Sequence, residues 1–581
     1  MQSEEGVCFV HGGVPCHRNG GGVYWKEKNG LPGEREKKGG ALPGGRSRRR
    51  RKALRGAAPR RRQGGNKEGT GMFAQIKSMG LLGVDGFLIN VEADLSQGLP
   101  GFDVVGLPGA AVRESRDRVR ASMKNCGFSY PVSRITVNLA PADVRKEGSV
   151  YDLPLLLALL KASGQLSEPL EDAAFIGELS LTGEVRPVRG VLPMVIAARD
   201  AGIPRAFIPA GNAAEGAVVD GIEVIPVDSL PSLLAHLSGE RPIPPAKPED
   251  FPELSAGTGS GVDFADVKGQ LAARRALEVA AAGAHNILLI GPPGSGKSML
   301  ARRLPTILPD MTPAEALEAT KIHSVAGTLP GGVGLLRERP FRSPHHGVSA
   351  AGLVGGGAVP RPGEASLAHQ GVLFLDELPE FNRQAMESMR QPLEDGTITI
   401  SRAAGTLSFP CSVMLVAAMN PCPCGYFGHP THPCICPDGA PARYLAKVSG
   451  PLMDRIDIHI EVPSVDFDQL SSGERAESSA AVRERVNAAR ERQRERLTGS
   501  GFTCNAKMDT RTTRETCHMT SDAQFLMRQA FDRLQLSARA YDKLLKIART
   551  VADLDASDDI QMEHVAEAIQ YRSLDRKLWQ V

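Results

Sequence analysis

A glycine-rich segment that ends in lysine and serine has the clearest chemistry in the sequence. Its backbone N–H groups can surround phosphate oxygens, Lys297 can reach the terminal phosphates of a nucleotide, and the Ser298 hydroxyl can bind Mg²⁺. The apolar run 285–290 predicts a strand before the segment, and a helix is predicted to begin at Ser298. A glycine-rich turn without a ligand is the alternative, which the order strand, loop, helix disfavours. The sequence therefore predicts that ATP is bound by Gly291, Pro292, Pro293, Gly294, Ser295, Gly296, Lys297 and Ser298.

Two further apolar runs predict buried strands that end in polar side chains. Residues 372–375 lead into Asp376 and Glu377, and residues 412–419 lead into Asn420. Ligands of parallel sheets bind at the carboxyl ends of the strands. We therefore expect Asp376 to hold Mg²⁺ through water and Glu377 to polarise the water that attacks the nucleotide. The alternative is that both acids are solvated residues at the end of a strand.

Four cysteines occur as two Cys-x-Cys pairs within residues 422–436. Tetrahedral Zn²⁺ accepts four sulfur ligands, and a short loop rich in Gly and Pro has few apolar residues to stabilise it otherwise. A closed site of four sulfurs leaves no open position for chemistry, so the expected role is structural. Buried free thiols, or a histidine as an alternative ligand, remain open. The predicted zinc ligands are Cys422, Cys424, Cys434 and Cys436.

The composition is that of an ordinary globular protein with several domains. The chain has 581 residues, of which 41% are hydrophobic and 23% charged, and this length exceeds what one hydrophobic core accommodates. The longest apolar run, 153–160, is far shorter than the roughly 20 residues that cross a bilayer. The N-terminus has no apolar block of the secretory kind. A cytoplasmic protein with reduced thiols and no membrane span is expected.

The positive charge of the chain is concentrated in residues 1–71. This segment contains 17 Lys and Arg against 6 Asp and Glu, whereas the rest of the chain contains 52 against 60. It is rich in glycine and shows neither helical nor strand periodicity, which indicates a disordered basic leader. One interpretation is an arm that binds nucleic acid. The other, which we favour, is upstream sequence translated from a misplaced start.

The remaining residues divide into three structured parts and a linker. Alternating and helical patterns indicate an α/β domain over residues 72–238, and five prolines among Gly and Ser indicate a linker over 239–261. An α/β domain with the phosphate loop and the cysteine cluster follows over 262–465. The C-terminal part, 466–581, is predicted to be helical. The patterns predict strands at 73–78, 87–92, 134–139, 174–179 and 206–208, and helices at 112–126, 194–201, 480–497, 523–534, 539–553 and 562–573.

Several unusual motifs occur in order along the chain: Gly106-Leu-Pro108, Asn138-Leu-Ala-Pro-Ala-Asp143, Pro344-His345-His346 and Ser449-Gly-Pro-Leu-Met-Asp-Arg455. With these motifs the chain resembles the magnesium-chelatase-like AAA+ family known as ComM or YifB, from Met72 to the C-terminus. The resemblance implies an α/β fold: a P-loop AAA+ ATPase core with a helical lid, preceded by a Lon-protease-like (ribosomal-S5-like) domain. It further implies a homo-oligomer, a hexameric ring, that remodels DNA by branch migration or helicase action during transformation and recombination.

The resemblance also assigns three polar side chains to catalysis. Asn420 matches a sensor that positions water, and Arg455 matches the finger that reaches the γ-phosphate in a neighbouring subunit. Arg539 matches the second sensor of the helical lid. A guanidinium group suits both arginine roles because its planar fork meets phosphate oxygens bidentately. For both arginines, a surface ion pair is the alternative.

Residues 72–238 resemble the Lon-type protease fold but lack its catalytic pair. A Lon-type protease needs a serine nucleophile with a lysine base within hydrogen-bonding reach. Val150 and Leu192 occupy the matching positions, and Ser149 is one residue away from the required place. We therefore expect a binding or assembly domain without peptidase activity.

A predicted hairpin over residues 396–409 is a candidate for contact with DNA. Two alternating runs flank a glycine-containing turn, and related helicases have a hairpin here that points into a central pore. Arg402 near the tip could contact a phosphate backbone; packing of the hairpin against the next subunit is the alternative. His345 and His346 are interpreted as loop-packing or substrate-contact residues, because no further metal ligands lie in their segment.

Two other functional classes remain open. The first is the motor subunit of a magnesium chelatase, which shares the ATPase core; the resemblance implies that such motors lack this N-terminal domain and the cysteine cluster. The second is a regulatory ATPase that remodels proteins, in which the Lon-like domain binds polypeptide.

Overall fold

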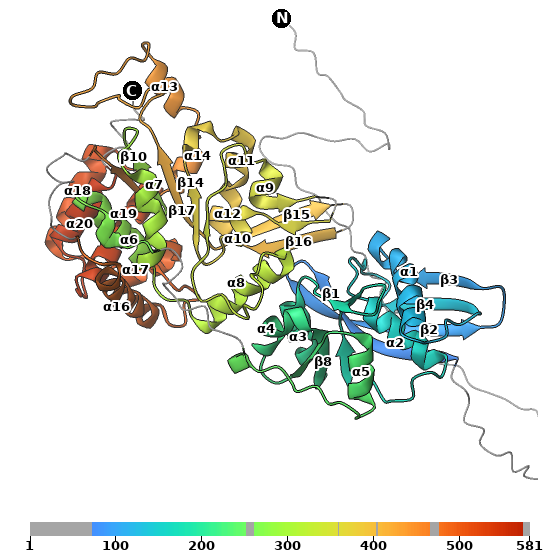
Figure 1. The fold of residues 1–581 in the computed structure, drawn as a ribbon. Coiled ribbons are helices and arrows are strands. Elements are labelled where there is room, and N and C mark those ends of the chain that lie inside the picture. The colour runs from blue at the N-terminus through green and yellow to red at the C-terminus, as the bar shows by residue number, and fades with distance from the viewer. Residues whose placement is uncertain (1–71, 251–260, 358, 403–404, 465–475, 573–581) are drawn as a thin grey trace, which may run out of the picture. The chain divides into compact units, whose positions relative to one another are not determined.

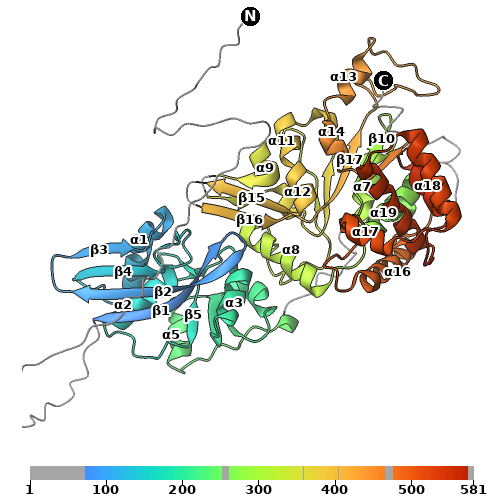
Figure 2. The same cartoon turned by 180° about the vertical axis from the view of Figure 1, so that it is seen from behind.

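The computed structural model describes residues 72–250, 261–357, 359–402, 405–464 and 476–572 (Figures 1 and 2). The predicted leader, 1–71, lies outside the described residues. Two sheets, each with its own helices, make the fold mixed α/β. Among the described residues, no helix is long and apolar enough to cross a membrane.

The first sheet has seven strands in the order β3-β4-β2-β1-β5-β8-β9. It is built around a long antiparallel hairpin of β1 (Phe73–Leu82) and β2 (Asp85–Ser96), as the alternating pattern predicted. Gly83 has a φ of +67° in the turn between these strands, a value that favours glycine. β4 is antiparallel to β2, and the remaining strands are parallel to their neighbours. The other strands are β3 (Gly101–Val105), β4 (Arg134–Ala140), β5 (Ala173–Phe175), β8 (Arg205–Pro209) and β9 (Glu223–Val227), with β6 (Glu178–Leu179) and β7 (Val185–Arg186) as a separate pair.

The core of this part is formed by the sheet and an unusually apolar helix. α2 (Asp152–Ala162) contains the longest apolar run of the sequence, and all its residues from Leu153 to Leu160 are buried. A helix that is apolar on all sides is stable only when surrounded by protein. The predicted strand 174–179 is instead divided into β5 and β6, because the Gly177 N–H leaves the sheet and donates to the Val150 carbonyl over 3.0 Å. The helices are α1 (Ala110–Asn125), α2, α3 (Val191–Asp200), α4 (Ala213–Ala217) and α5 (Leu230–Leu237).

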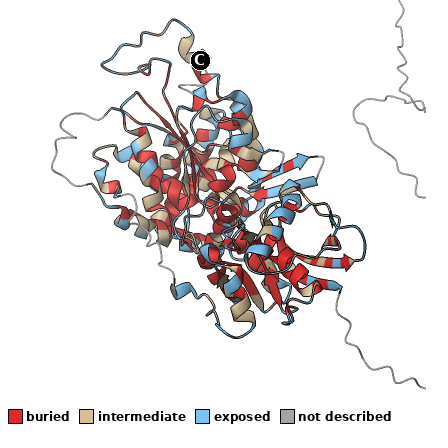
Figure 3. Cartoon of the chain, turned by 45° about the vertical axis from the view of Figure 1, so that its right-hand side comes forward, coloured by how far each residue is buried: buried red, intermediate tan, exposed pale blue. Residues whose placement is uncertain are grey.

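The second sheet has five parallel strands in the order β11-β14-β17-β10-β18. Its three central strands are buried along their whole length, as expected for a parallel sheet covered on both faces (Figure 3). β17 lies between β10 and β14, so the segments that follow these three strands emerge at one edge of the sheet. The strands are β10 (Ile287–Ile290), β11 (Phe341–Arg342), β14 (Val372–Leu375), β17 (Met414–Met419) and β18 (Ile458–Glu461).

Short helices and two small hairpins connect the strands of the second sheet. One hairpin, β15 (Thr397–Arg402) with β16 (Gly405–Pro410), confirms the predicted hairpin. The other pairs β12 (Gly355–Gly356) with β13 (Arg361–Pro362). The helices are α6 (Leu271–Gly283), α7 (Lys297–Arg303), α8 (Pro313–Ala326), α9 (Ala350–Val354), α10 (Glu364–Leu367), α11 (Arg383–Ser388), α12 (Arg390–Asp395), α13 (Ala440–Leu445) and α14 (Gly450–Met453).

Helices form the C-terminal part; α16, α18, α19 and α20 lie where the sequence pattern predicted helices, whereas α17 was not predicted. They share one hydrophobic core with α6 and the strands of the second sheet. Polar side chains add to this packing: Arg490 donates to the Ala281 carbonyl over 2.9 Å and Gln493 to the Ala282 carbonyl over 3.1 Å. The helices are α16 (Ser479–Leu497), α17 (Thr510–Thr516), α18 (Ser521–Leu534), α19 (Ala538–Leu554) and α20 (Met562–Gln570).

Candidate nucleotide site and cysteine cluster

The glycine-rich loop connects β10 to α7 and is shaped to approach a ligand with its backbone. Gly294 and Gly296 have φ values of +76° and +88°. A Cβ atom added to Gly294 would meet no other atom within 4 Å, so this side of the loop is open. A Cβ added to Gly291 would lie 2.1 Å from the Val462 carbonyl oxygen, so only glycine fits where the loop leaves the sheet. The open glycines and the helix start at Lys297 suit a bound phosphate.

Lys297 lies at the centre of the site and is only 9% exposed. Its Nζ donates to the Gly291 and Pro292 carbonyls, both over 2.8 Å, and to Asn420 Oδ1 over 3.2 Å. Burial lowers the pKa of the Lys297 ammonium, and the nearby Asp376 carboxylate opposes this effect. The loop carbonyls therefore hold a buried cation at the start of α7.

The residues expected to bind magnesium are in contact with each other. The Ser298 hydroxyl donates to Asp376 Oδ2 over 2.6 Å, and Asp376 Oδ1 accepts the N–H of Glu377 over 2.9 Å. Ser298 is the second residue of α7, which follows β10 and the glycine-rich loop, and Asp376 directly follows β14, so the ends of two parallel strands bring them together. A hydroxyl and a carboxylate are oxygen ligands that Mg²⁺ prefers.

Glu377 faces a cavity of about 400 Å³ next to the phosphate loop. Its φ of +54° turns the chain sharply at the end of β14. His346 Nδ1 lies 3.4 Å from Glu377 Oε2. The sequence did not predict this contact, because the Pro-His-His motif marks the histidine but gives no indication of its partner. Arg443 on α13 and Lys447, which follows this helix, also line the cavity, and no sequence pattern had singled them out. The lining residues are Glu377, Glu380, Asn420, Pro423, Ala440, Arg443, Tyr444 and Lys447.

The two arginines expected at the γ-phosphate lie beside one acidic residue of α12. Arg455 donates to the Pro451 carbonyl over 2.9 Å and forms a short ion pair with Glu394. Arg539 Nη2 lies 3.9 Å from the other oxygen of Glu394. The hydrogen bond from Arg455 lowers the pKa of Glu394. Within the described part of the chain, neither guanidinium donates a hydrogen bond to the phosphate loop of its own subunit.

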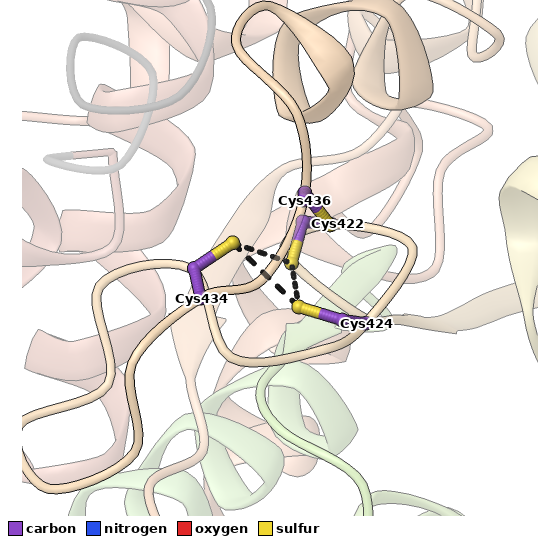
Figure 4. Close-up of side chains that lie close together, drawn as sticks. All are labelled: Cys422, Cys424, Cys434 and Cys436. Atoms are coloured by element: carbon purple, nitrogen blue, oxygen red, sulfur yellow. Dashed lines mark hydrogen bonds between the residues drawn. The ribbon is translucent and has the colours of Figure 1, made fainter.

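The four cysteines of the loop after β17 converge (Figure 4). Their sulfur atoms all lie within 4.8 Å of one another, and all four thiols are free. The sulfur of Cys422 is 3.4 Å from Cys424 and 3.8 Å from Cys434, and the last two are 3.6 Å apart. Ligands about 2.3 Å from a tetrahedral zinc ion are separated by about 3.8 Å. The Tyr426 N–H lowers the pKa of the Cys424 thiol to about 6. The cluster therefore matches a four-sulfur zinc site in ligand type and spacing.

Comparisons with known proteins cover nearly the whole described chain. Family models match residues 263–470 (magnesium chelatase, subunit ChlI), 91–212 (subunit ChlI of Mg-chelatase) and 476–572 (magnesium chelatase, subunit ChlI C-terminal). The competence protein ComM of Haemophilus influenzae is 43% identical over 511 residues, which are 87% of this chain and 98% of ComM. The chain belongs to the ComM/YifB family of magnesium-chelatase-like proteins. A second member, YifB of Escherichia coli, is 43% identical over 505 residues, 87% of this chain and 97% of YifB. The family supports an AAA+-type ATPase.

A weaker similarity links this ComM/YifB member to Lon protease. The Lon protease of Mycolicibacterium smegmatis is 27% identical over 180 residues, which are 29% of this chain and 23% of that protein. Val150 and Leu192, which match the catalytic pair of such proteases, are buried apolar residues. The Ser149 hydroxyl instead donates to the Glu178 carboxylate, and the buried Lys146 donates to the Pro141 carbonyl.

Proposed function

We propose that this protein is an ATP-hydrolysing AAA+ motor that forms a homo-oligomeric ring and acts on DNA. The observation that carries the ATPase activity is the convergence of Lys297, Ser298 and Asp376 at the carboxyl ends of β10 and β14, two parallel strands of one sheet. Membership of the ComM/YifB family supports the same activity. A cytoplasmic location is part of this proposal.

The phosphate loop has the features that a nucleoside triphosphate and Mg²⁺ require. Lys297 and the backbone N–H groups of residues 294–297 bind the phosphates, which carry the negative charge that this cation balances. Ser298 and Asp376 supply oxygen ligands for the metal. When bound, Mg²⁺ neutralises the charge that develops on the phosphate oxygens. The open face at Gly294 leaves room for this ligand.

Glu377 and Asn420 act on the attacking water. Glu377 lines the cavity beside the loop and polarises the water by accepting its hydrogen bond. Asn420 lines the same cavity and contacts Lys297, so its amide orients the water relative to the phosphate that Lys297 holds. Arg455 stabilises the γ-phosphate of a neighbouring subunit, and Arg539 of the C-terminal helices is the second sensor.

The domain boundaries of the motor follow from the sequence. Residues 72–238 form a non-proteolytic, Lon-like and ribosomal-S5-like domain for binding or assembly; the partial similarity to Lon protease supports this assignment. Residues 239–261 are the linker, 262–465 the ATPase domain and 466–581 the helical lid. The core shared between α6 and the C-terminal helices supports a lid that responds to the nucleotide.

The hairpin β15–β16 is the proposed DNA contact. Ile398, Ile400 and Phe409 are buried, whereas most other residues of the two strands, including Arg402, are exposed. An exposed arginine beside hydroxyl side chains suits contact with a phosphate backbone, independent of base sequence. ComM is named a competence protein, which supports a role in competence; DNA branch migration is the work that we propose for this motor.

The Cys422–Cys436 cluster holds one structural zinc ion in this proposal. Four free thiols at tetrahedral spacing support zinc over an oxygen-preferring metal. His429 accepts the N–H groups of Thr431 and His432 with its Nδ1, so this ring nitrogen is already used within the loop.

A chelatase motor is the second candidate, because two family models named for ChlI match the ATPase and the C-terminal part and a third matches residues 91–212.

ATP hydrolysis by the purified chain should be measured with forked DNA, with polypeptide and with a porphyrin-bearing chelatase partner. Stimulation by forked DNA is the expected result. Stimulation only by polypeptide or only by the porphyrin partner would replace the DNA assignment and leave the ATPase assignment intact.

A further inference from the structure

The cysteine cluster is connected to the nucleotide site by the chain itself. Asn420 directly follows β17, and Cys422 comes two residues later. Asn420 contacts Lys297 with its side chain, and Pro423 lies between two of the cysteines and lines the cavity next to Glu377. A movement of the cluster therefore changes the position of residues at the nucleotide.

The cysteine loop also lies directly against the phosphate loop. A Cβ atom added to Gly425 would lie 2.3 Å from Cδ and 2.7 Å from Cγ of Pro293. Gly425 has a φ of +86° and donates its N–H to the Cys422 carbonyl over 3.0 Å, so a tight turn within the cluster forms the contact. Because any larger residue would overlap Pro293, the two loops are in van der Waals contact.

Apart from this contact, the cysteine loop has little hydrophobic packing to fix its shape. Cys422 is fully buried, but Phe427 is 43% exposed and Ile435 is 82% exposed. The hydrogen bonds that His429 accepts from Thr431 and His432 stay within the loop, and the His429 contact with Ser464 over 3.2 Å reaches outside it. A metal ion that joins residues 422–424 to 434–436 supplies the missing cross-link.

We propose that a zinc ion bound by Cys422, Cys424, Cys434 and Cys436 sets the nucleotide affinity of the phosphate loop. The ion fixes the turn at Gly425 against Pro293, which supports the loop from behind, and it fixes Asn420 against Lys297. Without the ion, the cysteine loop gains conformations, and binding a nucleotide must order both loops. This inference rests on the proposed nucleotide binding at Lys297.

The proposed zinc ion positions the phosphate loop without contacting the nucleotide, so its removal should weaken nucleotide binding indirectly. Loss of such support typically weakens binding by about 10- to 100-fold. Zinc removal should therefore weaken binding of a fluorescent ATP analogue by at least about tenfold. Zinc removal should change the thermal unfolding of the first sheet and its helices little, because this part of the chain has its own hydrophobic core.

The test uses the full chain and three variants. Zinc content is measured by metal analysis, and nucleotide affinity by titration with the fluorescent analogue in the presence of Mg²⁺. The double variant Cys434→Ser, Cys436→Ser should lose zinc and affinity together. Gly425→Ala should keep all four thiols and the zinc but lose affinity, because the added methyl group displaces Pro293. Cys126→Ser is the matched control outside the loop and should change neither quantity.

The outcomes separate this inference from the proposed function. The inference would be overturned if the freshly purified chain contained no zinc. It would also be overturned if the zinc-free protein and Gly425→Ala bound the analogue as tightly as the unaltered chain. In both cases the proposed nucleotide binding would stand. If the zinc-loaded chain itself does not bind the analogue, the proposed function fails. Where the double variant does not fold, removal of zinc from the unaltered chain with a chelator, followed by the same titration, keeps the test decisive.

Discussion

The Nζ of Lys297 lies 3.2 Å from the side-chain oxygen of Asn420, so the phosphate loop and the end of the adjacent strand share a hydrogen bond. The two residues are 123 positions apart in the sequence and meet because β10 and β17 are neighbours in a parallel sheet. The proposed phosphate-binding cation and the proposed water-positioning amide thus belong to one contact.

Lys297→Ala and Glu377→Gln should damage different steps of the ATPase cycle. Lys297→Ala removes the buried cation and should weaken ATP binding, whereas Glu377→Gln spares the phosphate loop and should bind ATP but hydrolyse it slowly. Equilibrium binding of labelled ATP and steady-state phosphate release measure the two steps. Equal loss of binding in both variants would contradict the assigned roles.

Hydrolysis should need a neighbouring subunit. Arg455→Ala should bind ATP and hydrolyse little, because a finger of this kind contributes on the order of 10³–10⁵ in rate in well-studied NTPases. Mixing Arg455→Ala with Glu377→Gln should restore part of the activity, since some interfaces then combine an intact glutamate with an intact arginine. Mixed assemblies that contain both variants and remain inactive would show that Arg455 does not act in trans.

The hairpin should matter for DNA and not for basal hydrolysis. Arg402→Ala should reduce the stimulation of ATP hydrolysis by forked DNA, and Arg402→Lys should retain part of it because the charge remains. Thr399→Ala, on an exposed position of the same strand, is the control. DNA stimulation that is unchanged in Arg402→Ala would assign the hairpin to packing between subunits instead.

As the pH rises, nucleotide affinity should fall at a lower pH than it would with a lysine of ordinary pKa. Burial lowers the pKa of Lys297, so its ammonium loses its proton at a pH below the usual lysine value of 10.5. Binding of ATP needs the charged form, and affinity is therefore retained at neutral pH and lost as the pH rises through the lowered pKa. The dissociation constant is measured between about pH 7 and 10. Lys297→Arg, which does not titrate in this range, should show a flatter profile; identical profiles would exclude Lys297 as the titrating group.

Asp457 should be a major determinant of the stability of the ATPase domain. Its carboxylate accepts the Asn286 N–H over 3.1 Å and pairs with Lys543 of α19 over 3.1 Å, and the pKa of Asp457 is strongly lowered by Lys543 and His285 despite its burial. Asp457→Ala leaves the ammonium group of Lys543 without its carboxylate partner and should lower the free energy of unfolding by about 3–5 kcal/mol.

The measurement is the melting temperature of Asp457→Ala, compared with that of Asp454→Ala, which changes an exposed aspartate nearby. The contribution of Asp457 is present above the unfolded pKa of an aspartate and is lost as the pH falls, because the folded pKa is the lower one. Equal melting temperatures for the two variants would show that the pair stabilises nothing.

Sequence spacing located the parts of the site that come from one strand and the loop after it. The loop 291–298, Asp376 and Asn420 each directly follow a buried strand, so local pattern and the rule for parallel sheets were sufficient. The strand β3 was missed because it has only five residues and none of them is buried; Phe102 and Val104 alternate with exposed positions, but two half-buried residues are too short a pattern. The ion pair of Glu394 with Arg455 spans 61 residues, and that with Arg539 joins two different parts of the chain. No local pattern encodes such pairs.

The single carboxylate between Arg455 and Arg539 makes their contacts mutually dependent. An Arg455 side chain that reaches across to another subunit must first break its ion pair with Glu394, and Arg539, already 3.9 Å away, is then the cation left beside that acid. In the proposed ring, Glu394 would therefore lose its contact with Arg455 and keep the contact with Arg539. In the single chain, Arg455 is paired with its own Glu394, so under the proposed mechanism a neighbouring subunit must offer this arginine a more negative partner.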